Sequence, residues 1–330
     1  MKENNKDLKI VFMGTPEFAV GPLEALIQAG YNIAAVITVP DKPKGRGLKI
    51  QQSEVKKYTT KNTNIPILQP VSLKDPAFIE QMKEINADLF VVVAFRMLPK
   101  VLWSLPPLGT FNLHAALLPK YRGAAPINWA IINGEKETGV TTFLIDEKID
   151  TGRILFQEKY EIKDDDNIGT VYDKLMAMGS ELVVRTTACI ASGDITPIEQ
   201  KEDDTSNLYP APKLNKENRT IDWKKSSVDV HNLIRGLDPY PAALSTLATK
   251  NELDVITDVI NVKIFRSSLC DDENKHDNAG KIETDGHKYL RVLCGKGAIN
   301  ILELQLAGKK RLEIKAFLAG WKNKENSMFI

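Results

Sequence analysis

Apolar residues follow two alternating patterns along the first part of the chain: short continuous runs, and longer stretches with the period of a helix. The continuous runs are rich in β-branched residues and predict buried strands at 9–13, 33–39, 88–95, 111–114 and 140–145. The periodic stretches predict helices at 18–29, 53–61, 75–86 and 168–191. Strands that alternate with helices predict an α/β fold, with a Rossmann-like parallel sheet covered on both faces.

The pattern changes after residue 193. Residues 194–214 hold three prolines and an acidic cluster, which is typical of a linker. Beyond them the sequence predicts helices at 228–237 and 314–321, and short strands at 242–248, 259–265, 288–294 and 298–306. Several short strands separated by turns favour a small β-barrel. The expected organisation is therefore a catalytic domain at 1–193, a linker at 194–214 and a barrel domain at 215–330.

Composition narrows the class of protein. The chain has 330 residues, of which 43% are hydrophobic and 26% charged, as in globular proteins. Neither an apolar run of membrane-spanning length nor an apolar signal-peptide core is present, so we expect a cytoplasmic protein without a membrane partner. Three cysteines and four histidines are scattered, which predicts neither a disulfide framework nor a metal site. The net charge of +1 does not by itself indicate a polyanionic partner.

Two polar side chains mark the end of the predicted strand 111–114. Asn112 and His114 are two residues apart, so both point to the same face of an extended strand. An amide donor beside an imidazole suits a reaction in which an oxyanion develops. The amide can stabilise the negative charge, and the imidazole can both stabilise it and move a proton. Asp150, 36 residues later, offers a carboxylate that sets the imidazole tautomer. A satisfied turn or an ordinary buried histidine is the structural alternative for this pattern.

A basic segment occupies residues 40–52. Lys42, Lys44 and Arg46 are interleaved with glycine and proline, so we expect an exposed irregular loop. Such a loop either contacts phosphates or is simply solvated.

The sequence after the first strand disfavours a dinucleotide-dependent oxidoreductase and a nucleotide triphosphatase. Residues 10–14 end in Gly14, but neither Gly-x-Gly-x-x-Gly nor a P-loop sequence follows. Without the second glycine, the backbone cannot closely approach a pyrophosphate.

Several motifs in one order carry a family resemblance. They lie at 13–19, 40–47, 69–73, Asn112-x-His114, 117–126, 137–141 and 150–152, with weaker matches at 221–223 and 307–310. Through them the chain resembles the folate-dependent formyltransferases, most closely those that act on methionyl-tRNA. The resemblance covers nearly the whole chain.

The resemblance implies a fold and an activity. The C-terminal barrel is expected to be similar to an OB-fold and to bind tRNA. The enzyme would transfer a formyl group from 10-formyltetrahydrofolate, as co-substrate, to the free amino group of methionyl-initiator tRNA. Asn112, His114 and Asp150 would be catalytic. No metal would be needed, and the protein would act as a monomer.

The resemblance also implies binding residues. The residues expected at the folate are Phe95, Arg96, Met97, Leu98, Leu117, Leu118 and Pro119. The residues expected at tRNA are Lys42, Lys44, Arg46, Lys309 and Lys310, and those expected near the methionyl end are Gly14 and Thr15. The chain departs from the common pattern in a loop one residue shorter at 95–98, and in Ala116 where many relatives carry serine.

Two other kinds of function stay open. On the same fold, the acceptor could be glycinamide ribonucleotide or an amino-sugar nucleotide. Alternatively, the chain could be a non-catalytic RNA-binding protein that kept the scaffold.

Overall fold

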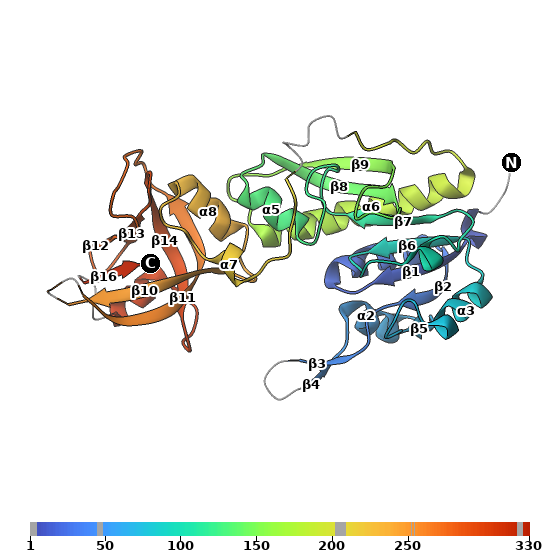
Figure 1. Ribbon diagram of the computed structural model, residues 1–330, viewed down its shortest axis with the longest axis horizontal. Coiled ribbons are helices and arrows are strands. Elements are labelled where there is room, and N and C mark those ends of the chain that lie inside the picture. Colours follow the sequence, from blue (N-terminus) through green and yellow to red (C-terminus); the bar gives the residue numbers. More distant parts are fainter. Residues whose placement is uncertain (1–4, 45–48, 202–208, 252, 254, 322–325) are drawn as a thin grey trace. The chain divides into compact units, whose positions relative to one another are not determined.

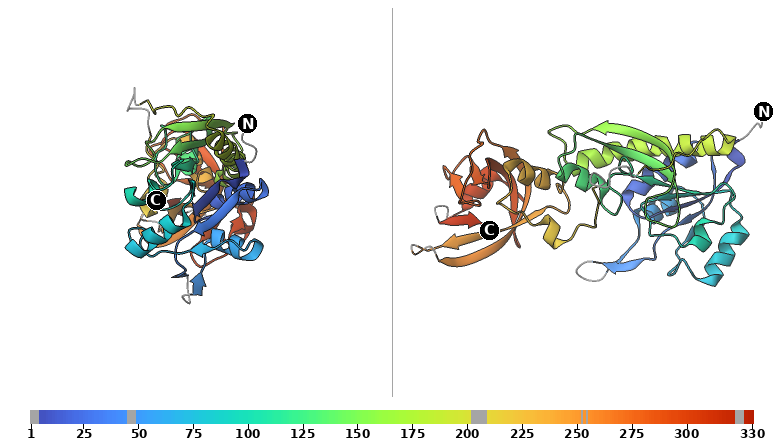
Figure 2. Two further views of the ribbon diagram at one scale, coloured as in Figure 1. Left: turned by 90° about the vertical axis from the view of Figure 1, so that its right-hand side faces the viewer. Right: turned by 45° about the horizontal axis from the view of Figure 1, so that its top comes forward.

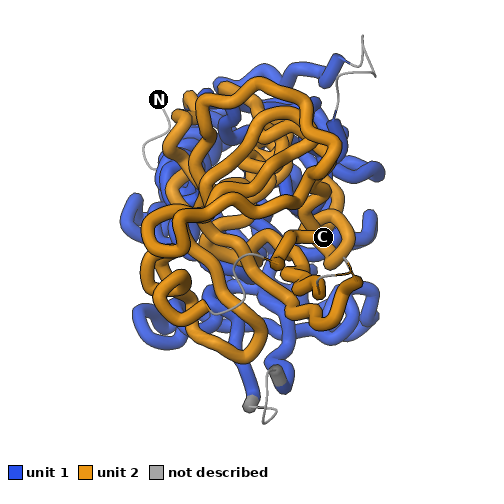
Figure 3. The backbone as a smooth tube through the Cα atoms, turned by 90° about the vertical axis from the view of Figure 1, so that its left-hand side faces the viewer, with its two compact units in different colours: residues 1–126, 138–160, 172–210 blue, residues 127–137, 161–171, 211–330 orange. Residues whose placement is uncertain are grey.

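The chain forms two compact units. The computed structural model describes residues 5–44, 49–201, 209–251, 253, 255–321 and 326–330. The first unit consists of residues 1–126, 138–160 and 172–210, and the second of residues 127–137, 161–171 and 211–330 (Figure 3).

A seven-stranded sheet organises the first unit, in the order β5-β2-β1-β6-β7-β8-β9 (Figure 1). Its strands are β1 (Lys9–Gly14), β2 (Asn32–Ile37), β5 (Ile67–Leu68), β6 (Leu89–Val93), β7 (Thr110–His114), β8 (Glu137–Leu144) and β9 (Ile154–Glu161). The strands from β5 to β7 are parallel, as predicted. β8 runs antiparallel to β7 instead. The sequence could not show this, because a fully buried apolar strand has the same pattern in either direction.

Helices cover both faces of this sheet. They are α1 (Val20–Gln28), α2 (Glu54–Asn62), α3 (Pro76–Ile85), α4 (Lys100–Trp103) and α6 (Ile168–Ser192), with short 3₁₀ turns η1 (Asn5–Asp7) and η2 (Glu17–Ala19). Ser53 and Asp75 cap α2 and α3 by accepting backbone N–H groups. Phe78 and Met82 of α3 pack in a core cluster with Val92 of β6. On the opposite face, Gly179 of α6 lies against the side chain of Leu113 in β7.

The basic segment differs from its prediction. Instead of an irregular loop, β3 (Lys42–Lys44) and β4 (Lys49–Gln51) pair antiparallel as a hairpin that projects from the sheet (Figures 1 and 2). Strands of three residues are too short to show a periodic pattern. Pro43 is tolerated because each strand of a two-stranded ribbon has a free edge.

The second unit is built on a nearly closed antiparallel barrel, in the order β12-β13-β14-β11-β10-β16, with β15 paired to β14. Its strands are β10 (Ala243–Lys250), β11 (Ile256–Leu269), β12 (Ile282–Thr284), β13 (Leu290–Leu293), β14 (Ala298–Leu306), β15 (Leu312–Glu313) and β16 (Ser327–Phe329). Pairing of Lys281 with Met328 joins the two ends of the order. Gly280 is required there, because a Cβ would lie 2.1 Å from the carbonyl oxygen of Phe329.

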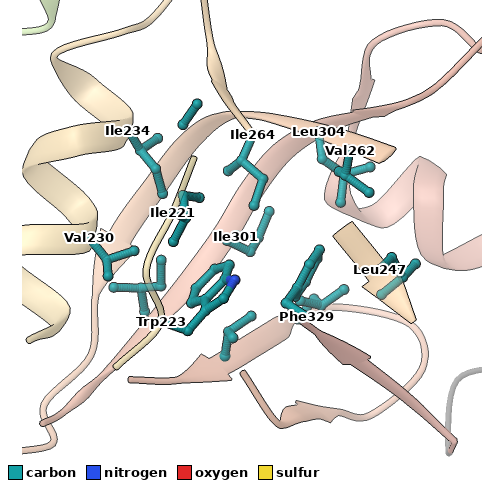
Figure 4. Packing of buried hydrophobic residues seen from close by; sticks show 14 of the residues in the cluster. Ile221, Trp223, Val230, Ile234, Leu247, Val262, Ile264, Ile301, Leu304 and Phe329 are labelled. Carbon is teal, nitrogen blue, oxygen red and sulfur yellow. The ribbon is translucent and has the colours of Figure 1, made fainter. Parts of the chain in front are cut away.

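The barrel encloses an apolar core (Figure 4). Trp223 and Phe329 stack with ring centroids 5.2 Å apart, and the indole Nε1 donates to the Ser245 hydroxyl. The helices of this unit are α5 (Pro126–Ile132), α7 (Lys216–Arg219), α8 (Ser227–Arg235) and α9 (Ile314–Gly320). The barrel-like prediction is thus confirmed.

Two segments that precede residue 193 belong to the second unit. Asn128 Nδ2 donates to the carbonyl of Gly236 at 2.8 Å, and Asn167 Nδ2 to Asp238 Oδ2 at 2.9 Å. Ile132 packs against the core cluster of the barrel. The compact units therefore do not follow chain order, and the domain bounds 1–193, 194–214 and 215–330 stay a prediction.

Candidate active site

The candidate site lies at the carboxyl end of β7. Leu113 faces α6, so its neighbours Asn112 and His114 point to the other face of the sheet. Asn112 is in register with Val92 of β6, which packs in the cluster with α3 and α4. Ligands of such sheets bind beyond the carboxyl ends of the strands.

The proton on His114 is placed by a backbone carbonyl. The imidazole is 6% exposed, and its Nε2 lies 2.8 Å from the carbonyl oxygen of Tyr121. A carbonyl oxygen only accepts, so Nε2 carries the proton and the neutral ring has its lone pair on Nδ1. The edge of the ring meets Phe143 of β8. The tautomer is thus selected by Tyr121, not by Asp150 as the sequence suggested.

Asp150 lies beside the other ring nitrogen. Its Oδ2 is 3.8 Å from His114 Nδ1, beyond hydrogen-bond length, and accepts from the backbone N–H of Gly123 at 2.9 Å. The turn that carries Asp150 packs against β8 so closely that a Cβ on Gly152 would lie 1.7 Å from the Leu144 carbonyl oxygen. The carboxylate therefore lies beside Nδ1 without a hydrogen bond that would set the neutral tautomer.

The loop at 95–98 is tied to the segment after β5. The Arg96 guanidinium donates to the carbonyls of Val71, at 2.9 Å, and Pro70, and lies over the ring of Phe95. Burial lowers the pKa of Arg96. Beside it, residues 71–74 and 96–100 line an open groove of about 630 Å³. Met97 is exposed on this rim, whereas Leu98 is buried in the core cluster.

The second predicted folate segment is held by two polar residues that sequence reasoning missed. Thr141 Oγ1 donates to the Ala116 carbonyl at 2.6 Å, and Gln157 Nε2 to the Leu118 carbonyl at 2.8 Å. Leu118 is buried, and Leu117 and Pro119 are half-buried. Because these partners are backbone carbonyls, no side-chain pattern in the sequence marks them.

The methionyl-end residues follow β1. Gly14 is packed so tightly that a Cβ would lie 2.6 Å from Ala19 Cβ. The carbonyl of Thr15 accepts from the N–H of Val55, at the start of α2. Glycine at 14 thus has a packing reason, independent of any ligand.

The predicted tRNA residues fall in both units. Lys42 is exposed on β3, and Lys309 and Lys310 are exposed in the turn after β14. Lys44 lies on β3, while Arg46 falls outside the described residues.

The described residues contain neither a metal-binding cluster nor a membrane-spanning helix. No group of three or more histidine, cysteine, aspartate or glutamate side chains there could hold a metal ion. Likewise, none of the helices in the described ranges is both long and apolar enough to cross a membrane.

Comparisons with known proteins match almost the whole chain to formyl transferases. The family described as "Formyl transferase" matches residues 8–187, and "Formyl transferase, C-terminal domain" matches residues 213–322. The chain is 49% identical over 318 residues to a methionyl-tRNA formyltransferase of Bacteroides thetaiotaomicron, covering 96% of this chain and 97% of the relative. It is 50% identical over 314 residues to that of Flavobacterium johnsoniae, covering 95% and 96%.

Solved structures share the fold. WlaRD, described as a sugar 3N-formyl transferase, has a TM-score of 0.64 at 22% identity, covering 92% of this chain and 99% of that one. An N-formyltransferase of Helicobacter canadensis has a TM-score of 0.63 at 23% identity, covering 89% and 98%. At these identities the likeness concerns the fold alone. The two family matches and the half-identical relatives together show that the chain belongs to the formyl transferase family.

Proposed function

We propose that the chain transfers the formyl group of 10-formyltetrahydrofolate to the free amino group of methionyl-initiator tRNA. The observation that carries the proposal is identity of about one half, over almost the full length of both chains, to relatives named methionyl-tRNA formyltransferase. The product, N-formylmethionyl-tRNA, would serve translation initiation in the cytoplasm. We further propose that the enzyme acts as a monomer.

The site residues support direct transfer. The methionyl amine would attack the formyl carbon, and the carbonyl oxygen would gain negative charge in a tetrahedral intermediate. Asn112, on the same face of β7 as His114, would donate a hydrogen bond to this oxygen. Loss of one such donor typically costs ~2.7–4 kcal/mol of transition-state stabilisation.

His114 would move the proton. Its Nδ1 lone pair is set by the Tyr121 hydrogen bond, so it can accept the proton that the attacking amine loses. The imidazolium would then be stabilised by Asp150, 3.8 Å away. When the bond between the formyl carbon and the folate nitrogen breaks, the same proton would go to that nitrogen, which leaves the enzyme unchanged.

Substrate contacts are proposed at four places. Residues 95–98 and 117–119 would line the folate pocket, because the first follow β6 and the second follow β7 beside the catalytic pair. Gly14 and Thr15 would lie near the methionyl end. Lys42, Lys44, Arg46, Lys309 and Lys310 would contact tRNA phosphates.

The decisive experiment compares acceptors with one formyl donor. Purified enzyme and 10-formyltetrahydrofolate are assayed with charged initiator tRNA, glycinamide ribonucleotide and an amino-sugar nucleotide. We expect kcat/KM for the charged tRNA to exceed that for either small acceptor by at least a thousandfold. Faster transfer to a sugar nucleotide would overturn the proposal in favour of the activity named for the structural neighbours. Absence of transfer to any acceptor would favour a binding protein.

A further inference from the structure

A segment of the predicted linker docks against the candidate active site. Ile198 pairs with Ile154 at the start of β9 through two backbone hydrogen bonds of 2.7 and 2.8 Å. This pairing brings Gln200 to the turns that carry Asp150 and Arg122, all within the first unit. Ile198 and Gln200 are therefore part of the packing of the first unit and do not belong to a free connection.

The amide of Gln200 joins these two turns. Its Nε2 donates to the carbonyls of Asp150, at 2.9 Å, and Gly152, at 2.8 Å. Its Oε1 accepts from Arg122 Nη2 at 2.8 Å and Nε at 3.2 Å. Both donors and the acceptor of the side chain are thereby used, and every partner lies next to the catalytic groups.

Tyr209 makes a second connection. Its carbonyl accepts from the N–H of Tyr121 at 2.9 Å, and the two rings stack with centroids 6.0 Å apart. Tyr121 is the residue whose own carbonyl places the proton on His114.

The two turns need such support, because both hold a non-glycine residue in the left-handed region. Asp150 has φ of 55° and Tyr121 has φ of 60°. Residues in this region cost free energy and persist only when their surroundings fix them. The hydrogen bonds of Gln200 fix the carbonyl of Asp150, and Gly123, next to Arg122, donates to its carboxylate. Asp150 is thus held at its main-chain carbonyl by Gln200 and at its carboxylate by Gly123.

We propose that Gln200 is a positioning residue for the reaction: it holds Asp150 at the distance from His114 at which the carboxylate stabilises the imidazolium. The proposal rests on the proposed function. Gln200 touches no reacting atom, so it acts through Asp150.

The test combines kinetics with a double-mutant cycle. We expect Gln200→Ala to lower kcat at least tenfold, while KM for methionyl-tRNA changes by less than twofold and the melting temperature stays within a few degrees. Gln200→Glu keeps an acceptor for Arg122 but loses the donors, and we expect a similar loss. Glu199→Ala is the matched control, since this neighbouring side chain is 82% exposed, and it should leave kcat unchanged.

The cycle separates positioning from general destabilisation. If Gln200 acts through Asp150, Gln200→Ala should cost less than twofold in an Asp150→Ala background. An equal loss in both backgrounds, or an unchanged kcat in the single variant, would overturn the proposal.

A readout without substrate keeps this test independent of the proposed function. The ring NMR signals of His114, identified by their loss in His114→Ala, should shift in Gln200→Ala and not in Glu199→Ala. Unshifted signals would contradict the positioning role even if methionyl-tRNA proves not to be the acceptor. A shift in a protein inactive on methionyl-tRNA would instead count against the proposed function alone.

Discussion

At the scale of residues, the proposed reaction depends on which ring nitrogen of His114 carries the proton. The hydrogen bond to the Tyr121 carbonyl leaves the lone pair on Nδ1, which we propose is the base, and Asp150 lies beside it. A backbone carbonyl, that of Tyr121, therefore contacts one ring nitrogen of His114, and a carboxylate, that of Asp150, lies near the other. The carbonyl of Tyr121 fixes the neutral tautomer, and the carboxylate of Asp150 lies 3.8 Å from the other ring nitrogen.

Replacing His114 by alanine should remove proton transfer without removing tRNA binding. We expect kcat to fall by about 10²–10⁴, which is the usual contribution of a general acid–base residue. The dissociation constant for methionyl-tRNA, measured by filter binding, should change by less than threefold. A variant with normal turnover would show that the imidazole is only a buried structural group.

His231 should make the stability of the second unit depend on pH. Burial, with a smaller effect from Arg235, lowers the pKa of His231 to about 4, and its Nδ1 lies 2.9 Å from the Ser267 hydroxyl. The unfolded chain therefore binds a proton near pH 6.5, whereas the folded chain does not until about pH 4. Stability is fully present above pH 6.5 and is lost as the pH falls through this window, by on the order of 3 kcal/mol.

The measurement is the free energy of unfolding in urea at pH 7.5 and pH 4.5. The matched variant is His231→Asn, which keeps a polar group toward Ser267 but does not titrate. We expect the wild-type protein to lose more stability between the two pH values than this variant. Equal losses would show that His231 titrates normally in the folded state.

The sequence revealed some site residues and concealed others for a physical reason. Strand alternation is enough to place Asn112 and His114 on one face, and the family motif supplied Asp150. Thr141, Gln157 and Gln200 escaped notice because each bonds to backbone carbonyls, which every residue possesses. A side chain that bonds to the main chain needs no particular residue type as its partner, so a single sequence does not reveal the contact.

At the scale of elements, long segments were predictable and short ones were not. The predicted helix 168–191 is α6 (Ile168–Ser192), and the predicted strand 298–306 is β14 (Ala298–Leu306). Because these elements are long, the helical period or the strand alternation repeats several times and can be recognised in the sequence. The hairpin of β3 and β4 and the two-residue β5 have too few positions for any pattern, and they depend on their pairing partners.

The hairpin supports a prediction about tRNA. Removing one cation, in Lys42→Ala or Arg46→Ala, should raise KM for methionyl-tRNA several-fold at low salt and leave KM for the folate unchanged. The effect should shrink as salt rises, because phosphate contacts depend on counterion release. Lys61→Ala is the control, since it removes an exposed lysine at the end of α2. A KM that is unchanged and insensitive to salt in both variants would refute the assignment.

At the scale of the whole molecule, the two units are not consecutive stretches of chain. Residues 127–137 and 161–171 pack with residues 211–330. The predicted boundary at 193 came from a change in composition, and it could not reveal this arrangement. Composition describes the residues of a segment but not which other segment it packs against.

Separately expressed fragments test the predicted domain bounds. We expect fragment 215–330 to unfold at a lower temperature than the corresponding transition of the full chain. It lacks Asn128 and Asn167, whose hydrogen bonds to Gly236 and Asp238 typically contribute about 1 kcal/mol each. Equal melting temperatures by circular dichroism would show that 215–330 is complete as a folding unit.

The same interleaving has a consequence for biosynthesis. A nascent chain emerges from the ribosome in order, so residues 127–137 appear long before the barrel strands with which they pack. Until those strands are made, the side chain of Ile132 lacks its partners in the barrel core. The growing polypeptide therefore exposes this apolar side chain for much of translation, and exposed apolar surface of this kind is what makes incomplete chains prone to aggregate and dependent on chaperones.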